Sequence, residues 1–284
     1  VHKYPLDTVH NYHMLTEDFL PLYDMIKVLD LDKKKKIKGL SAQRADILPA
    51  ALAVVKAFIN YMNVESFTIS GAGLREGIMF NQALPSTIEK PISDVLTYSL
   101  TTLVKWYDCD ERHVEHVVNL SIQLFKQLRV LHKFPRQYLK VLKVAATLHD
   151  CGMRIKYYNH QRHSWYMILN ANLYGVTHRE IVLAAFTACC HKKEDINPLD
   201  WARYKDILRE EDIEIVKRLG VMLRIAESLD RSMSGCIKGI NCDILGDSVI
   251  MKTEVEGDAS LEIRDAMAAG AEFKKSFHKN LEIL

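Results

Sequence analysis

Cysteine is scarce in this sequence, and its spacing is uninformative. The chain of 284 residues contains six cysteines, and none of them forms the C-x-x-C spacing of a zinc or redox motif. Their density is also too low for a small secreted scaffold stabilised by disulfides. The sequence therefore predicts free thiols and a cytoplasmic protein, and it argues against zinc held by thiolates.

Long apolar runs and a strong net charge are absent as well. No apolar run approaches the roughly 20 residues that span a bilayer, and the formal net charge is only +2 at pH 7. A charge this small does not by itself indicate a polyanionic or membrane partner. We therefore expect neither a nucleic-acid polymer nor a membrane among the partners. There is no signal-peptide pattern, and the chain begins with Val1, which we interpret as a fragment of a longer protein.

The remaining composition is that of a globular protein with two or three compact units. Hydrophobic residues make up 48% of the chain and charged residues 26%. We predict an α+β fold, predominantly α, divided into regions 1–90, 91–233 and 234–284. The last boundary rests on a change after Ser234 to short alternating runs separated by Gly-Asp, a hairpin signal. A helical stretch over about 258–278 and a final short apolar run complete a small α+β unit.

The first region combines a helix, a short strand and a glycine loop. Apolar residues at helical spacing predict a helix over about 43–61. A β-rich run follows at 66–70 and ends in glycines. The segment 81–94 contains two prolines and then Ser93, a predicted helix cap, so we place a boundary there.

The middle region is helical in period from about 94 to 231, and several of its polar residues fall on apolar faces. Thr177 and Glu180 form a predicted capping box. Residues three, four, seven and eleven apart share a helix face, and by this test four positions point inward: His113, the pair His149 and Asp150, His191 and Asp230. By the same test His116 is a surface residue.

These inward imidazoles and carboxylates come from separate helices. A lone inward histidine would be a hydrogen-bonded core residue, but an unpaired buried charge costs several kcal/mol. A divalent cation would neutralise the group, and imidazole with carboxylate oxygen suits Mn, Fe, Zn or Mg. The alternative is a polar core held together by hydrogen bonds alone.

The order and placement of these residues resemble the HD metal-dependent phosphohydrolase superfamily over roughly 108–232. The resemblance implies an all-α HD domain that binds one metal, and the residues it assigns to that metal are His113, His149, Asp150 and Asp230. It implies that His163 and His191 bind a second metal or orient phosphate. We rank His160 below His163 as a ligand, because His163 fits the start of the next helix.

Two motifs of the first region carry a second resemblance. "RADILPA" (Arg44–Ala50) opens a helix and "SGAGLREG" (Ser70–Gly77) closes a strand. Together they look like the end of the second actin-like (ribonuclease H-like) domain of the exopolyphosphatase and guanosine pentaphosphate phosphohydrolase family. Glycines let backbone N–H groups approach a phosphate, and arginine adds a forked donor. The predicted phosphate or nucleotide site is Ser70, Gly71, Gly73, Arg75 and Glu76; the alternative is a plain turn with Arg75 paired to Glu76.

This resemblance implies a phosphoanhydride hydrolase whose catalytic glutamate lies outside the chain. The chain would then be the C-terminal part, which binds polyphosphate or guanosine pentaphosphate, supports a homodimer and uses Mg or Mn. Possible polyanion contacts, which solvated surface charges explain as well, are Arg154, Lys156, Arg162, Lys192 and Lys193. Two other functions remain open. One is an independent HD phosphohydrolase or phosphodiesterase acting on a nucleotide, and the other is a non-catalytic nucleotide-sensing or dimerisation module.

Overall fold

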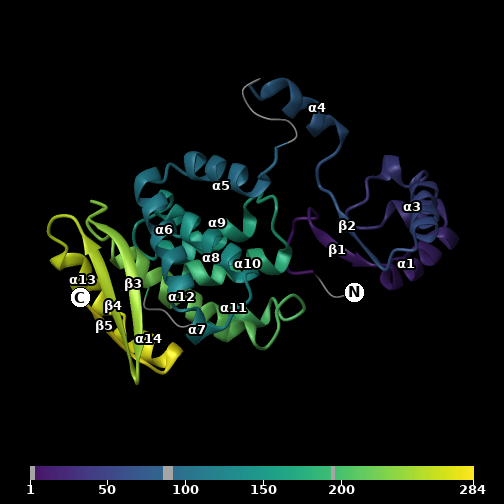
Figure 1. Cartoon of the computed structure of the whole chain (residues 1–284). Coiled ribbons are helices and arrows are strands. Elements are labelled where there is room, and N and C mark those ends of the chain that lie inside the picture. Colours follow the sequence, from purple (N-terminus) through teal and green to yellow (C-terminus); the bar gives the residue numbers. More distant parts are fainter. Residues whose placement is uncertain (1–3, 86–91, 193–195) are drawn as a thin grey trace. The chain divides into compact units, whose positions relative to one another are not determined.

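A computed structural model describes residues 4–85, 92–192 and 196–284 (Figure 1). It divides the chain into two compact units. The small unit is Thr8–Leu84, and the large unit combines Val1–Asp7 with Pro85–Leu284. The mixed α+β composition with a majority of helix agrees with the predicted fold class. None of the helices in these ranges has the length and apolar character that a bilayer crossing requires.

The small unit packs helices against a two-stranded antiparallel sheet. Its strands are β1 (Tyr12–Leu15) and β2 (Ser66–Ile69), with Tyr12 opposite Ile69. Its helical elements are α1 (Thr16–Val28), α2 (Leu31–Lys35), the 3₁₀ turn η1 (Ala42–Arg44), α3 (Leu48–Met62) and α4 (Leu74–Ala83). Helix α3 begins later than predicted because Pro49 fits only the first turn of an α-helix, where its missing N–H is not needed.

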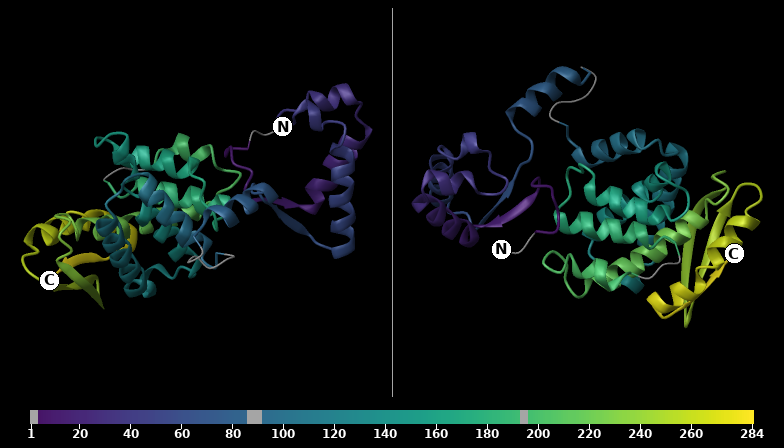
Figure 2. Two further views of the ribbon diagram at one scale, coloured as in Figure 1. Left: turned by 90° about the horizontal axis from the view of Figure 1, so that it is seen from above. Right: turned by 180° about the vertical axis from the view of Figure 1, so that it is seen from behind.

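Helices form most of the large unit (Figures 1 and 2). The longer ones are α5 (Val95–Trp106), α6 (Glu111–Gln127), α8 (Gln137–Leu148), α9 (His160–Asn170), α10 (His178–Cys189) and α12 (Asp212–Ser228). Short turns join them: α7 (Arg129–His132), the 3₁₀ turn η2 (Cys151–Arg154) and α11 (Pro198–Ala202). Helix α6 buries one apolar face in the common core, whereas α8, α10 and α12 are buried on nearly all sides over much of their length, which fixes the positions of the polar residues at their ends.

Helix caps fall close to the predicted positions. The capping box at Thr177 and Glu180 is confirmed: Thr177 Oγ1 accepts from the Glu180 backbone N–H, and Glu180 accepts in return from that of Thr177. Ser93 was predicted to cap the next helix, but the cap of α5 is Asp94, whose carboxylate accepts from the Thr97 backbone N–H at 2.9 Å. Both residues are good caps, so their order alone could not decide between them.

The C-terminal strands and helices pack on one side of the helical body (Figure 2). The predicted hairpin is confirmed: β3 (Ile237–Leu245) pairs antiparallel with β4 (Ser248–Val255), and Gly246 takes a positive φ of 51° in the turn. The predicted single helical stretch consists of α13 (Ser260–Met267) and α14 (Gly270–Phe277). The last run forms β5 (Asn280–Ile283), parallel to β4. Buried residues of these elements, such as Phe273, belong to the same core as the helices.

Candidate metal centre

Asp150 lies at the centre of a cluster of four histidines. Helix α8 ends at Leu148, so His149 and Asp150 emerge where the chain leaves the buried helix and enters η2. Asp150 Oδ2 lies 3.5 Å from His149 Nε2 and 3.8 Å from His113 Nε2. Asp150 Oδ1 lies 3.2 Å from His160 Nε2 and 3.7 Å from His191 Nε2. One carboxylate therefore faces four imidazoles from α6, α8, α9 and the end of α10.

Two groups of side chains in this cluster are close enough to share a metal ion, and Asp150 belongs to both. One group is His113, His149 and Asp150, and the other is Asp150, His160 and His191. His149 and His191 are fully buried. Their ligand atoms are therefore held by packing, which favours a defined coordination geometry.

Backbone hydrogen bonds orient three of the imidazoles. In His149, His160 and His191, Nδ1–H donates to the carbonyl three residues earlier in the chain, at 2.8, 2.8 and 2.5 Å. A carbonyl only accepts, so Nδ1 carries the proton and Nε2 is left with a lone pair toward Asp150. Metal-binding histidines use this arrangement, in which one nitrogen is held by the protein and the other binds the ion.

Several metal-ligating atoms at the centre of the cluster face one another or lack a hydrogen-bond partner among the described residues. His160 Nε2 and His191 Nε2 lie 3.1 Å apart, a contact between two acceptors unless a proton or a cation lies between them. A further atom, His149 Nε2, is buried without a hydrogen-bond partner in the described part of the chain. Buried polar atoms are rarely left in this state. The donor set therefore fits one or two divalent cations.

The ionisation of these groups suits metal binding. Burial alone would raise the pKa of the Asp150 carboxyl, but the charge of His149 and the hydrogen bond from His160 hold that pKa well below its usual range. Burial lowers the pKa of His191 to about 3, so this imidazole is neutral. Burial opposes the charged form of His160, yet its hydrogen bond with Asp150 outweighs this effect and raises the pKa of His160. A cation would replace the proton that His160 otherwise holds.

Asp230 forms a hydrogen bond with the ring nitrogen of His113 that points away from Asp150. Its Oδ2 accepts a hydrogen bond from His113 Nδ1 at 2.7 Å, and its Oδ1 accepts from the Gly235 backbone N–H at 2.9 Å. Burial opposes the charged form of His113, but the hydrogen bond to Asp230 outweighs it and raises the pKa of His113. Asp230 belongs to neither candidate ligand group among the described residues. In this arrangement Asp230 orients His113, and the direct ligand role that the HD resemblance implied for Asp230 stays a prediction.

His116 does not lie on the surface as its helical position indicated. Its side chain is 20% exposed, and its Nε2 lies 4.0 Å from Asp230 Oδ1. The periodicity test compared His116 only with residues of its own helix. The environment of the imidazole is set instead by Asp230, which follows α12 and lies against α6.

His160, which the sequence ranked below His163, is the residue that faces Asp150. Helix α9 begins at His160, three residues earlier than the predicted start, and this places His160 on the same face as the fully buried Ile168. His163 is partly buried and belongs to neither ligand group in the ranges described. The signal was present: His160 and Ile168 are eight residues apart, a helical spacing that aligns them on one face.

A cavity of about 270 Å³ opens onto the cluster. Its walls include His113, Asp150, His160 and Asp230. Three further charged residues line it: Lys192, which the sequence suggested as a polyanion contact, and Glu227 and Arg231, which helical periodicity did not identify. Glu227 is buried, and its Oε1 lies 2.5 Å from Lys192 Nζ and 3.5 Å from Arg231 Nη1. Two cations therefore share one carboxylate oxygen at the edge of the site.

The other predicted polyanion contacts do not gather at this cavity. Arg154 lies 3.0 Å from Asp108, and Arg162 lies 3.6 Å from Asp200, so both have carboxylate partners elsewhere. Lys156 is exposed and does not line the cavity. Lys193 lies outside the described residues. Of the four that the structure describes, only Lys192 borders the site.

The backbone N–H groups of the glycine loop in the small unit donate to nearby side chains. The Gly71 N–H donates to His10 Nδ1 at 3.1 Å, the Ala72 N–H to Ser70 Oγ at 3.2 Å, and the Gly73 N–H to Glu76 Oε2 at 2.8 Å. All three amides that would meet a phosphate already have acceptors. Glu76 caps α4 and does not pair with Arg75 in the way the alternative suggested. A phosphate site that also includes Arg75 stays a prediction.

Comparison with known proteins places the chain in a family. A family model described as Ppx/GppA phosphatase, domain III, matches residues 95–263, more than half of the chain and all residues of the candidate metal centre. The chain belongs to the Ppx/GppA phosphatase family. A second model, described as Ppx/GppA phosphatase family, matches residues 2–86. The resemblance to the exopolyphosphatase and guanosine pentaphosphate phosphohydrolase family is therefore confirmed, and the HD and actin-like assignments stay predictions.

Relatives of the Ppx/GppA chain include named hydrolases. A guanosine-5'-triphosphate,3'-diphosphate pyrophosphatase of Aeromonas salmonicida (strain A449) is 31% identical over 143 residues, which cover 50% of this chain and 28% of that protein. The protein of the same name from Aliivibrio fischeri (strain MJ11) is 30% identical over 155 residues, covering 55% and 29%. The match spans less than a third of either relative.

Proposed function

We propose that this chain is part of a phosphoanhydride hydrolase of the Ppx/GppA family and that its large unit carries a divalent metal centre of the HD type. The relatives named above are pyrophosphatases of a guanosine nucleotide, which supports guanosine pentaphosphate as the substrate. The observation that carries the metal centre is the convergence of four Nε2 atoms on Asp150. Polyphosphate as a substrate and a homodimeric state are further proposals, which rest on the family alone.

Each residue of the cluster has a defined task in this proposal. Asp150 bridges two ligand groups, with His113 and His149 on one side and His160 and His191 on the other. A divalent ion held there would act as a Lewis acid toward a phosphoryl oxygen. Asp230 and the backbone carbonyls keep the imidazoles in the binding tautomer.

Lys192 and Arg231 are the groups that would orient the phosphate. Both side chains line the cavity and are partly exposed, at 30% and 43%. Both cations lie next to Glu227, and Arg231 also lies 3.9 Å from Asp265, so each has a carboxylate partner as well as access to the cavity. Burial would raise the pKa of Glu227, but the charge of Lys192 and its hydrogen bond hold that pKa below its usual range, so Glu227 stays ionised and holds both cations.

The complete ligand set also favours a second candidate function. Hydrolysis of a phosphoanhydride or phosphodiester bond at the metal centre itself would make the large unit an independent HD phosphohydrolase. This candidate differs from the first in one measurable respect: it predicts that this chain alone hydrolyses the substrate and that Asp150→Asn abolishes the hydrolysis, whereas the first places the catalytic glutamate outside this chain. A chelator would abolish hydrolysis at the HD centre.

The test is the metal content of the purified chain and of the variant Asp150→Asn. We expect the wild-type chain to retain Mn, Fe or Zn on elemental analysis and Asp150→Asn to lose it, because both ligand groups share Asp150. Asp108→Asn, which removes a surface carboxylate paired with Arg154, is the matched control and should keep the metal. Hydrolysis of guanosine pentaphosphate by this chain and by Asp150→Asn then separates the two candidates, because only the second predicts activity in this chain that depends on Asp150. Equal metal content in all three proteins would contradict the proposed centre.

A further inference from the structure

Exposed apolar side chains lie beside the candidate metal centre. The cavity of about 270 Å³ over the centre is lined by Met153, Tyr157 and Met233 as well as by polar residues. The exposed fractions of these three side chains are 40%, 62% and 52%. Single exposed apolar residues are common on protein surfaces, but these three come from two segments far apart in sequence and border one cavity. The cavity therefore has the mixed lining, apolar with a few fixed polar groups, of a small-molecule site.

Two of these residues are tied through their backbones to candidate ligands of the centre. The Met153 N–H donates to the Asp150 carbonyl at 2.9 Å, and the Tyr157 carbonyl accepts from His160 Nδ1 at 2.8 Å. The centroid of the Tyr157 ring lies 5.9 Å from that of His160 and 5.6 Å from that of Tyr158, which meets it edge to face. Tyr157 stays largely exposed despite both contacts, so its ring is held in place and part of it is open to a ligand.

The third residue, Met233, is held by the loop that follows α12. Its N–H donates to the Asp230 carbonyl at 2.9 Å, and its backbone takes a positive φ of 57°. On one side the Ser232 N–H donates to the buried Glu262 at 3.1 Å, and on the other the Gly235 N–H donates to Asp230 Oδ1 at 2.9 Å. A positive φ is uncommon outside glycine and persists where the surrounding bonds impose it. The loop therefore holds an apolar side chain at the cavity in a conformation that methionine alone does not favour.

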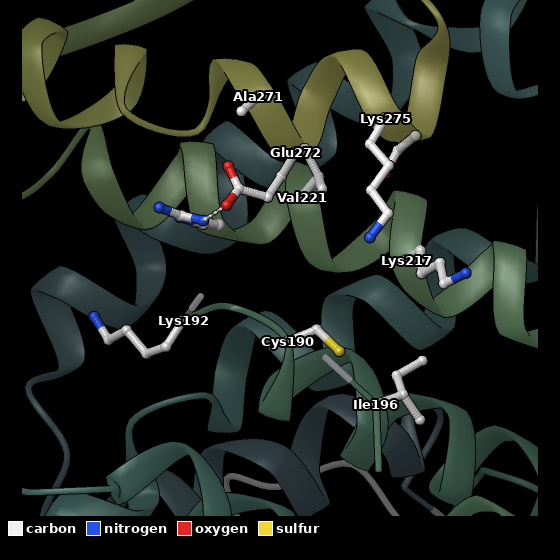
Figure 3. Close-up of a pocket in the computed structure, with 10 residues that line it drawn as sticks. Cys190, Lys192, Ile196, Lys217, Val221, Ala271, Glu272 and Lys275 are labelled. Carbon is white, nitrogen blue, oxygen red and sulfur yellow. Dashed lines mark ion pairs between the residues drawn. The ribbon is translucent and has the colours of Figure 1, made fainter. Parts of the chain in front are cut away.

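A second cavity, of about 310 Å³, lies in the large unit between the end of α10, helix α12 and helix α14 (Figure 3). Its charged side chains have carboxylate partners: Arg224 pairs with Glu272 at 3.2 Å, and Lys217 pairs with Glu214 at 3.1 Å. The described residues that line it include no aromatic ring. The cavity at the metal centre differs in presenting such a ring next to its polar groups.

From these observations we infer that the ligand of the metal centre is a nucleoside phosphate and that Tyr157, Met153 and Met233 determine this specificity by contacting the face of the base. The cavity is slightly smaller than the range of about 300–1,000 Å³ that is usual for small-molecule sites. The phosphate therefore lies inside the cavity, and the base lies across its mouth on Tyr157. Every base has a face that can stack, so this contact selects nucleotides over inorganic phosphates without distinguishing guanine from adenine. The inference rests on the proposed function, because it places the phosphate at the metal centre.

The experiment is calorimetric titration of the full chain, equilibrated with Mn²⁺, with GMP, AMP and ribose 5-phosphate. We expect both nucleotides to bind more tightly than ribose 5-phosphate, which has the same sugar and phosphate but no base. Tyr157→Ala should weaken GMP and AMP alike by about 5- to 100-fold, the effect of losing a stacked aromatic side chain, and should leave ribose 5-phosphate unchanged. Met233→Asn retains a residue that tolerates positive φ and should weaken both nucleotides by about two- to tenfold.

Tyr166→Ala is the matched control. Tyr166 is a tyrosine of α9 with 59% of its side chain exposed, and it does not line the cavity. Its replacement should change none of the three affinities. Equal affinity of the wild-type chain for GMP and ribose 5-phosphate would overturn the inference. An unchanged ratio of these two affinities in Tyr157→Ala would overturn it as well.

The content of bound Mn²⁺ separates a failure of this inference from a failure of the metal centre. Tyr157→Ala keeps the backbone carbonyl that orients His160, so this variant should bind Mn²⁺ as the wild type does. A chain that binds Mn²⁺ but does not prefer nucleotides would retain the metal centre and contradict the base contact. A chain that binds no Mn²⁺ but whose affinity for GMP depends on Tyr157 would contradict the metal centre and support the base contact.

Discussion

At the scale of single residues, the metal centre depends on which atom of each side chain is already engaged. Asp150 has both oxygens toward imidazoles, whereas Asp230 uses its two oxygens on His113 and on a backbone amide. Two carboxylates of similar burial therefore differ in their task. Asp150 is available to an ion, and Asp230 fixes the orientation of a ligand.

Replacing Asp230 by asparagine tests this difference. We expect Asp230→Asn to weaken metal affinity by about 10–100-fold, because the partner that orients His113 loses its charge. Asp150→Asn should abolish binding. Isothermal titration with Mn²⁺ measures both, and Asp265→Asn, near Arg231 on the surface, serves as the control. If Asp230→Asn abolished binding as completely as Asp150→Asn does, Asp230 would be a direct ligand, as the sequence first indicated.

At the scale of elements, the position of helix α9 depends on Gly152. A Cβ at this residue would lie 2.2 Å from the His160 carbonyl oxygen and 2.4 Å from the Ser164 backbone nitrogen. The Gly152 N–H also donates to Ser164 Oγ at 2.9 Å. Helix α9 therefore starts directly against η2, and this contact brings His160 to Asp150.

Gly152→Ala should damage both the fold and the centre. The methyl group meets backbone atoms, which cannot rotate away, so α9 must shift and carry His160 with it. We expect a loss of roughly 1–3 kcal/mol in the free energy of unfolding, together with weaker metal binding. Urea unfolding and Mn²⁺ titration measure the two effects.

Gly270→Ala is the matched control for Gly152→Ala, since a Cβ at Gly270 has no atom within 4 Å. It should leave both quantities close to those of the wild type. Unchanged metal affinity in Gly152→Ala would show that the start of α9 does not position His160.

At the scale of the whole molecule, the large unit takes part of its core from the beginning of the chain. Leu6 is 7% exposed and belongs to the core of the helices. Tyr4 Oη and His178 Nδ1 form a hydrogen bond of 2.6 Å. Residues 4–7 therefore contribute to a unit whose other residues begin at Pro85.

A chain of residues 92–284 tests how far the large unit folds without this segment. We expect it to unfold cooperatively and to keep its metal, because all cluster residues are present. Its free energy of unfolding should be lower by at least about 1.5–3 kcal/mol, the contribution of burying one leucine. Urea unfolding of this chain and of the full-length variant Leu6→Ala gives the comparison. Equal stability of the truncated and full chains would show that residues 4–7 add nothing.

The sequence by itself determined the features that depend on local chemistry. Periodicity identified His113, His149, Asp150 and His191 as inward residues, because each lies on or directly after a helix whose apolar face is evident. The capping box at Thr177 and the Gly-Asp hairpin followed from side-chain and turn preferences over a few residues. The family resemblance followed from short motifs.

Only the tertiary structure decided which inward residues meet. The choice of His160 over His163 depends on the close contact of Gly152 with α9, and the burial of His116 depends on Asp230, more than a hundred residues away in sequence. The parallel pairing of β5 with β4 and the cavity between α12 and α14 likewise join segments that share no local pattern. Periodicity gives the face of each helix, whereas the partner of that face is set by packing between distant segments.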